Sequence, residues 1–199
     1  MEIIRKTITS DEEYLRQVSM PIDFNDDNVM DYILALKEYC ENNAVYALAP
    51  VQIGMPKRII YIRNSNENMD KNIDKEYNEA TIFINPEIVS EKGHSRFLEG
   101  CDSCTYMKGD IKIYYASIID RPYSIEVEYY GVHGNKQKTI LEGFIATIFK
   151  HENDHLNGKL HLDKASEIYE MTLEEMKQYR ELHPYEVIST DKPFELVRK

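Results

Sequence analysis

Long apolar runs are missing from this 199-residue sequence, and basic residues are outnumbered. No stretch approaches the roughly 20 consecutive apolar residues that a membrane-spanning helix needs. The first residues also lack the apolar segment of a signal peptide. The chain has 24 basic and 35 acidic residues, and a negative surface is repelled by nucleic-acid phosphates and anionic lipids. We therefore expect a cytoplasmic protein that binds neither nucleic acids nor membranes directly.

Cysteine is also scarce. The three cysteines, Cys40, Cys101 and Cys104, are an odd number, which argues against a disulfide framework. In a reducing compartment, a cysteine is a buried apolar residue, a free thiol or a metal ligand. Cys40 falls within an expected amphipathic helix and is most simply a core residue.

Internal repeats, low-complexity tracts and strand–helix–strand alternation are absent, which favours an α+β fold built on antiparallel sheets. This fold would surround a central His-Glu-x-x-His helix. We expect one catalytic domain over residues 1–165, and a C-terminal helical extension of the same domain over 166–199. The pattern predicts helices at about 27–42, 144–156 and 165–182, strands at 58–62 and 81–90 with a turn at Asn85-Pro86, a hairpin over 124–141, and a loop at 63–80.

The central helix carries His-Glu-x-x-His at His151, Glu152 and His155. Apolar residues at helical spacing between Gly143 and Gly158 predict the helix. Residues four apart lie on one face, so both imidazoles can reach one metal ion. Glu152 can contact a water there, as metal-assisted amide hydrolysis requires. The alternative is that the helix carries two surface histidines at this spacing by chance. A third metal ligand would decide between a metal site and a chance pair.

Cys101 is the best candidate for that third ligand. It follows Gly100, which would let the backbone approach a metal closely. Two imidazoles and one thiolate leave an open position, which is the arrangement of catalytic rather than structural sites. Cys104 is the rival, because as a fourth ligand it would close the site. An open position explains Glu152 and a closed one does not, so Cys104 more simply packs in the core.

Three segments together resemble the peptide deformylase family, which removes the N-formyl group from newly made proteins. The family motifs are Gly-x-Gly-Leu-Ala-Ala-x-Gln, Glu-Gly-Cys-x-Ser and variants of Gln-His-Glu-x-x-Asp-His-Leu. The matching segments here are Val45-Tyr46-Ala47-Leu48-Ala49-Pro50-Val51-Gln52, Glu99-Gly100-Cys101-Asp102-Ser103 and Lys150-His151-Glu152-Asn153-Asp154-His155-Leu156. Similarity of order and spacing extends from about residue 4 to 165.

The resemblance implies a metal centre and a substrate. Cys101, His151 and His155 would hold one divalent ion, Fe²⁺ first, with Zn²⁺, Ni²⁺ or Co²⁺ able to replace it. Glu152 would act as the general base and then as the general acid. The partners implied are N-formylmethionyl peptides and nascent chains, with the ribosome as a further partner.

The resemblance also implies groups that contact the substrate. The side chain of Gln52 and the backbone N–H of Asp102 would stabilise the oxyanion. Arg121 matches a basic residue that helps to bind the peptide. The full set of implied substrate-binding residues is Val45, Tyr46, Ala47, Glu99, Gly100, Arg121, Phe144 and Ile148.

The chain departs from the family pattern at the substrate cleft. Val45 and Ala47 stand where the family has glycines, and a Cβ there is costly if the backbone needs a positive φ. Asp102 replaces a leucine and brings a carboxylate to the mouth of the pocket, where it could repel acidic peptides, attract basic ones or slow the reaction. The polar loop at 63–80 and the C-terminal extension suggest a divergent, insertion-bearing member.

These departures keep two other functions open. One is a divergent metal-dependent amidase on the same fold, with a shifted N-acyl-peptide substrate. The other is a non-catalytic binder of nascent-chain N-termini. Retention of Glu152 argues against the binder, because binding needs no general base.

Overall fold

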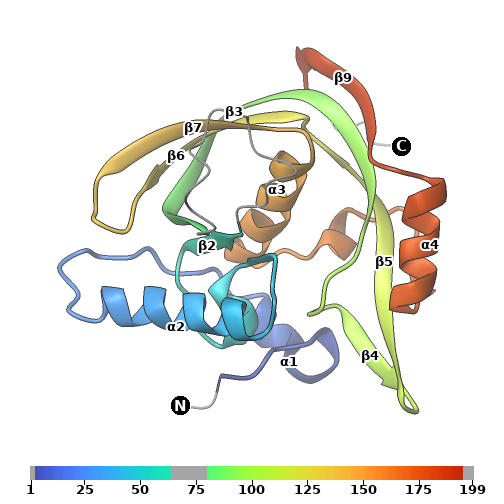
Figure 1. The fold of residues 1–199 in the computed structure, drawn as a ribbon, viewed down its shortest axis with the longest axis horizontal. Coiled ribbons are helices and arrows are strands. Elements are labelled where there is room, and N and C mark those ends of the chain that lie inside the picture. The colour runs from blue at the N-terminus through green and yellow to red at the C-terminus, as the bar shows by residue number, and fades with distance from the viewer. Residues whose placement is uncertain (1–2, 64–79, 195–199) are drawn as a thin grey trace.

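The computed structural model describes residues 3–63 and 80–194. In this part of the chain, a 9-stranded sheet, all of whose strand pairings are antiparallel, curves around one central helix, α3 (Phe144–Leu156) (Figure 1). The predicted α+β class, with antiparallel sheets around the His-Glu-x-x-His helix, is confirmed. Most of the loop expected at 63–80 lies outside the described residues.

The other elements follow the chain in order. The first part of the chain forms α1 (Ile8–Leu15), α2 (Val29–Asn42), β1 (Ala47–Leu48), the 3-10 helix η1 (Pro50–Ile53) and β2 (Ile59–Ile62). Of these, β1 and β2 belong to the sheet. The sheet continues with β3 (Thr81–Glu99), β4 (Thr105–Lys108), β5 (Ile111–Arg121), β6 (Ser124–Tyr130) and β7 (Lys136–Glu142). After α3 come η2 (His161–Lys164), β8 (Tyr169–Met171), α4 (Leu173–Leu182) and β9 (Glu186–Pro193).

Strand β3 connects most of the sheet, because it pairs with β2, β5, β6 and β9. The expected turn at Asn85-Pro86 is wrong: the strand continues through it, with a shift of register against β6 between Ile84 and Glu87. Asn85 has a φ of 47°, a conformation that asparagine tolerates better than most residues. Its side chain accepts a hydrogen bond from Ile22 N and donates one to Ile22 O, so the irregularity anchors the N-terminal segment.

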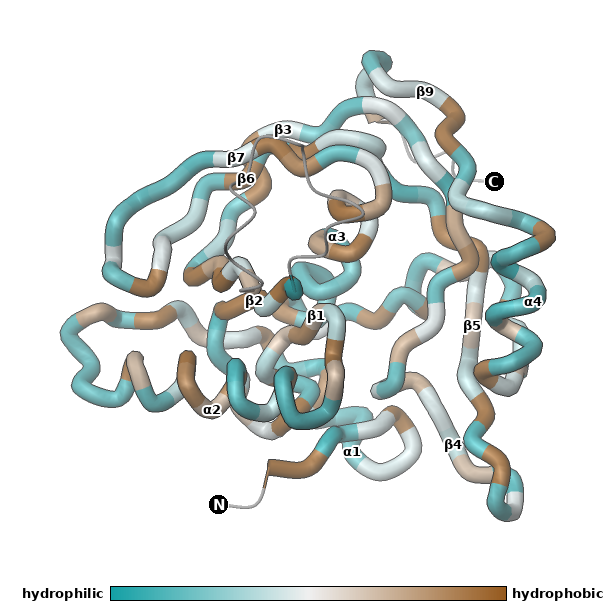
Figure 2. The backbone as a smooth tube through the Cα atoms, in the orientation of Figure 1, coloured by the Kyte–Doolittle hydropathy of each residue, from teal (hydrophilic) through white to brown (hydrophobic). Residues whose placement is uncertain are grey.

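Helix α3 is buried on the concave side of the sheet. Phe149 is fully buried, and its ring meets the Phe83 ring edge-on at 5.1 Å. Ile125 and Val127 of β6 belong to the same core cluster. Apolar positions gather where α3 faces the sheet, whereas the far end of β7 is hydrophilic (Figure 2). Burial of one helix face fixes how its other face, which carries the histidines, is presented.

The sequence suggested a helical C-terminal segment, but the structure contains two strands there as well as one helix. Strand β8 pairs with β5 and strand β9 pairs with β3, with α4 between them. Helix α4 begins at 173 because Thr172 and Glu175 form a capping box, in which Glu175 N donates to the Thr172 hydroxyl at 3.2 Å. The domain boundary at residue 165 stays a prediction. No helix among the described residues is long and apolar enough to cross a membrane.

The end of α3 gives a test of this packing. Gly158 has a φ of 67°, and a Cβ there would lie 2.2 Å from Arg16 O. Gly109 has a φ of 63° with nothing within 4 Å of its Cβ position. We expect Gly109→Ala to cost about 1 kcal/mol from the left-handed conformation. Gly158→Ala should cost about 1–3 kcal/mol more, because the backbone at 16–17 must move. Urea unfolding measures both, and equal losses would contradict the close contact.

Candidate metal centre

Three potential metal ligands converge between β3 and α3. Cys101 lies in the turn after β3, and His151 and His155 lie one turn apart on α3. One ligand atom from each residue lies within 4.8 Å of the others. The Cys101 Sγ is 3.4 Å from His155 Nε2. The structure therefore brings together the three residues that the sequence selected.

Each imidazole offers the same nitrogen to the centre. The Nδ1 of His151 donates to Glu99 Oε2 at 2.9 Å, which leaves its Nε2 for a metal. His155, only 1% exposed, turns its Nε2 toward Cys101. Its Nδ1 is buried without a hydrogen-bond partner among the described residues. A thiolate and two imidazole Nε2 atoms suit Fe²⁺, Zn²⁺, Ni²⁺ or Co²⁺.

Cys104 lies behind the centre rather than in it. It is fully buried beside Leu15 and Leu160, and its N–H donates to Cys101 O at 2.9 Å. A hydrogen bond from the Cys104 thiol lowers the pKa of Cys101, and the charge of His155 lowers it further. The pKa of Cys104 itself is raised by this bond and by burial. Cys104 thus supports a thiolate at Cys101 while remaining protonated.

Glu152 lines the pocket next to the three ligands. Its carboxyl group is buried, which raises its pKa. One oxygen, Oε2, is buried without a hydrogen-bond partner among the described residues. Leaving a buried polar atom unpaired costs about 1–3 kcal/mol, and a water beside a metal ion would satisfy it. The donor set and this oxygen together fit a catalytic metal site with an open position.

Gln52 is held at the edge of the centre by η1. Its Oε1 accepts from Ala49 N at 3.0 Å, which fixes the orientation of the amide. Its Nε2 therefore faces the turn after β3, where it lies 3.2 Å from Ser103 Oγ and 3.4 Å from Cys101 Sγ. The amide presents a donor beside the metal ligand without further movement.

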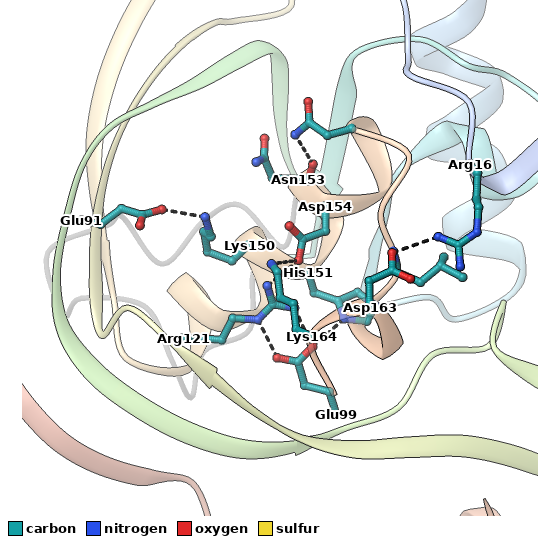
Figure 3. Close-up of polar contacts among 12 residues, drawn as sticks. Arg16, Glu91, Glu99, Arg121, Lys150, His151, Asn153, Asp154, Asp163 and Lys164 are labelled. Carbon is teal, nitrogen blue, oxygen red and sulfur yellow. Dashed lines mark hydrogen bonds and ion pairs between the residues drawn. The ribbon is translucent and has the colours of Figure 1, made fainter. Parts of the chain in front are cut away.

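A buried ion-pair network supports the histidine side of the centre (Figure 3). Arg121 donates from Nε to Glu99 Oε1 at 2.7 Å and from Nη2 to Glu99 Oε2 at 2.8 Å. Its Nη1 pairs with Asp154 of α3, which also binds Lys164. Although burial alone raises it, the charge of Arg121 holds the pKa of Glu99 well below its usual range.

This network corrects two predicted roles. Arg121 is 1% exposed and does not line the pocket, so it does not contact a peptide there. Strand β5 pairs antiparallel with β3, where Arg121 lies opposite Ser95, and the Arg121 side chain reaches the Glu99 carboxylate from there. Glu99 reaches the pocket wall, but its carboxylate is engaged by Arg121 and His151. Glu99 holds the His151 ring by a hydrogen bond, and Arg121 holds Glu99 in turn.

The pocket at the centre has a volume of about 420 Å³. It is lined by the predicted residues Gln52, Cys101, Asp102, His151 and Glu152, and by all the predicted substrate-binding residues except Arg121: Val45, Tyr46, Ala47, Glu99, Gly100, Phe144 and Ile148. His155, one turn after His151 on α3, is not among the lining residues. The sequence missed Arg5, Asn43, Ala44, Phe97, Thr147 and Arg180. Arg5 and Arg180 come from segments without a motif, so only the tertiary fold reveals them. Thr147 lies one turn before His151 on α3, where helical spacing could have found it.

Known proteins of similar sequence and structure are peptide deformylases. A family model described as Polypeptide deformylase matches residues 4–170. The peptide deformylase of Rhizobium meliloti is 34% identical over 166 residues, which span 83% of this chain and 87% of that protein. Peptide deformylase 2 of Clostridium acetobutylicum is 32% identical over 167 residues, spanning 82% and 97%. The crystal structure of peptide deformylase from Thermotoga maritima has a TM-score of 0.66 at 26% identity, covering 84% of this chain and 99% of that one.

The chain belongs to the polypeptide deformylase family. It is a metal-dependent hydrolase that removes the N-formyl group from the N-terminal methionine of newly synthesised proteins. The recognition made from the three motifs is confirmed.

The departures from the family motifs leave the site intact. Neither Val45 nor Ala47 has a positive φ, so their Cβ atoms cause no backbone strain. The left-handed residue in this region is Ala44, with a φ of 52°. The Asp102 carboxylate does not hang free at the mouth of the deformylase pocket. It accepts from Lys112 Nζ at 2.6 Å and from the Tyr114 hydroxyl at 2.9 Å, so its charge is offset.

The ion pair of Arg121 should contribute strongly to stability. Arg121→Met removes the guanidinium from two buried carboxylates, Glu99 and Asp154, and should cost about 3–5 kcal/mol. Arg96→Met is the matched control, because Arg96 also pairs bidentately with an aspartate, Asp120, but at the surface. It should cost about 1 kcal/mol or less.

Urea unfolding at pH 7 and pH 6 measures the difference between the Arg121 and Arg96 variants. The lowered pKa of Glu99 means that the contribution is present above the ordinary value of 4.5 and is lost only as the pH falls below it. The gap between the variants should therefore be the same at both pH values. Similar losses in the two variants would contradict a buried network.

Glu99 should control metal affinity. Glu99→Gln keeps the shape of the side chain but removes the charge that orients His151, so affinity should fall about 10- to 100-fold. Glu91→Gln is the control, because Glu91 pairs with Lys150 on the same helix (Figure 3). Competition with a chelator, monitored with Co²⁺, gives the affinities. Equal affinity in both variants would rule out this role.

Proposed function

We propose that Cys101, His151 and His155 bind a single divalent metal ion, and that Glu152 moves the proton during deformylation. The observation that carries the proposal is the set of ligand atoms within 4.8 Å of one another, with the unpartnered Glu152 Oε2 in the same pocket. When bound, the metal supplies Lewis-acid chemistry that activates water and polarises the formyl carbonyl. We take Fe²⁺ as the native ion, with Zn²⁺, Ni²⁺ and Co²⁺ as replacements.

Glu152 is placed to act first as a base and then as an acid. Its raised pKa, caused by burial, brings it closer to the range in which a carboxylate can accept and return a proton near neutral pH. In the proposed reaction, Glu152 takes the proton of the attacking water. It then delivers that proton to the nitrogen of methionine as the bond to the formyl carbon breaks, so that formate and a free amine leave.

Two donors would stabilise the charge that develops on the formyl oxygen. Gln52 Nε2 is held next to Cys101 by the bond of its Oε1 to Ala49 N. The backbone N–H of Asp102 follows directly after the cysteine ligand. Donors that are fixed before the reaction lower the barrier because they need no reorganisation.

Apolar walls beside the metal ligands would receive the methionine side chain. Val45 and Tyr46 approach from the segment before β1, and Phe144 and Ile148 from the first turns of α3. The Phe144 ring packs edge-on against Phe97 at 5.0 Å, which keeps this wall rigid. The pocket volume of about 420 Å³ suits a formyl group and one unbranched side chain.

The alternative functions lose their support in this geometry. A shifted amidase was suggested by Ala47 and Asp102, but the first is unstrained and the second is paired with Lys112. A non-catalytic binder would leave Glu152 buried and unpartnered for no purpose. The cytoplasm and the ribosome, where formylated chains emerge, remain the predicted location and partner.

The role of Glu152 has a direct test. We expect formate release from formyl-Met-Ala-Ser by the Fe²⁺-loaded protein under anaerobic conditions. Glu152→Ala should lower kcat about 10²- to 10⁴-fold while one metal ion per chain is retained. Glu142→Ala, on the exposed face of β7, is the control and should keep wild-type activity. No formate from the fully loaded wild type, or full activity in Glu152→Ala, would refute the proposal.

A further inference from the structure

Two arginines at the mouth of the pocket have no role in the reaction described above. Arg5 comes from the N-terminal segment and Arg180 from α4, at opposite ends of the chain (Figure 1). Both line the same pocket as the metal ligands. Neither forms an ion pair with a carboxylate in the described part of the chain. Partly buried guanidinium groups without a directly paired carboxylate are costly, so this pair needs an explanation.

Arg180 is fixed against the wall of the pocket. Its Nε donates to Leu98 O at 3.0 Å, and its guanidinium lies 4.9 Å from the centre of the Phe97 ring. A Cβ built on Gly100 would lie 3.9 Å from Arg180 Nη2, so this nitrogen sits over the backbone that leads into Cys101. A guanidinium has five N–H donors in a planar fork. The bond to Leu98 uses the Nε donor and leaves the outer edge of the fork for a ligand.

Arg5 is held in a similar way. Its guanidinium lies 5.7 Å from the centre of the Tyr39 ring and hydrogen-bonds to the Tyr39 side chain. It is close enough to Cys101 and Asp102 to interact with their charges. Contacts of this kind limit the motion of a long side chain, so less entropy is lost when it binds an anion.

The acidic groups near the pocket do not neutralise the two arginines. Lys112 offsets Asp102 at 2.6 Å, and Arg121 offsets Glu99 at 2.7 Å. The two arginines therefore keep N–H donors for a carboxylate of the substrate, although the whole chain has a formal charge of −11.

We propose that Arg5 and Arg180 form a carboxylate-binding subsite that favours formylpeptides with an acidic group in the residues after formyl-methionine. The inference rests on the proposed function, because the formyl group at the metal centre sets the direction in which the peptide leaves the pocket. Planar guanidinium groups bind carboxylates through paired, charge-assisted hydrogen bonds. The carboxylate comes either from an aspartate or glutamate side chain or from the C-terminus of a short peptide.

Matched peptides test the subsite. For the Fe²⁺-loaded protein, kcat/KM should be about tenfold higher for formyl-Met-Glu-Ser-amide than for formyl-Met-Gln-Ser-amide, since hydrogen bonds to a charged group are worth about 1.5–3 kcal/mol. Formyl-Met-Ala-Ser as free acid and as amide reports on the C-terminal carboxylate. The ratio for Glu over Gln should decrease as salt increases. A ratio near one for both peptide pairs, with turnover intact, would overturn the subsite.

Variants assign the preference to the arginines. In Arg180→Gln, the ratio for Glu over Gln should fall to about two or less, and in the double variant with Arg5→Gln it should vanish. Lys177→Gln removes the same charge from an exposed position of the same helix and should keep the tenfold ratio. A preference that survives in the double variant would overturn the proposal. If Arg180→Gln fails to fold, the single variants Arg180→Lys and Arg5→Gln replace it. Each should lower the ratio of kcat/KM for the Glu peptide over the Gln peptide.

Binding of the products separates this inference from the proposed function. Calorimetry with Met-Glu-Ser-amide and Met-Gln-Ser-amide measures the charge preference without turnover, and the affinity should be about tenfold higher for the glutamate peptide. Absence of formate release with this preference intact would refute the reaction at Glu152 but keep the subsite. Formate release, with equal affinities and equal kcat/KM values for the glutamate and glutamine peptides, would support the reaction at Glu152 and refute the subsite.

Discussion

The bidentate ion pair between Arg121 and Glu99 is the interaction on which the site depends. It joins the end of β5 to the end of β3, and Glu99 passes the constraint on to His151 of α3. Asp154, on the same helix, takes the remaining arm of the guanidinium. Three elements that are far apart in the sequence are thereby fixed around one point. Hydrogen-bond partners of this kind set the orientation of metal ligands, and here they fix the proposed ligand His151.

Because of this ion pair, the residues that line the mouth of the pocket can change without moving the residues proposed to bind the metal. Charges behind the proposed ligands are paired and buried, whereas Glu152, Arg5 and Arg180 line the pocket without an ion pair among the described residues. The buried pairs stabilise the geometry of the centre and take no part in binding. Changes at the mouth, such as aspartate at position 102, are absorbed by local partners such as Lys112. A divergent deformylase can thus alter its peptide preference without disturbing the metal ligands.

Local patterns predicted the parts of the molecule that short-range physics determines. The four-residue spacing of His151 and His155 requires only a helix, and Gly158 marks its end because it adopts a positive φ. Partnerships across the fold were not predictable. Arg121 was predicted to bind the peptide because nothing near it in the sequence shows that its side chain pairs with Glu99 of β3. Arg180 was missed for the same reason, since α4 reaches the pocket only through the tertiary fold.

The central claim is that the metal site is open, with one sulfur and two nitrogen ligands from the protein. X-ray absorption spectroscopy of the Fe²⁺- or Zn²⁺-loaded protein measures the number and type of these ligands directly. We expect one sulfur, from Cys101, two imidazole nitrogens, and an oxygen from solvent in the remaining position. Two sulfur ligands, with Cys104 closing the site, would contradict it.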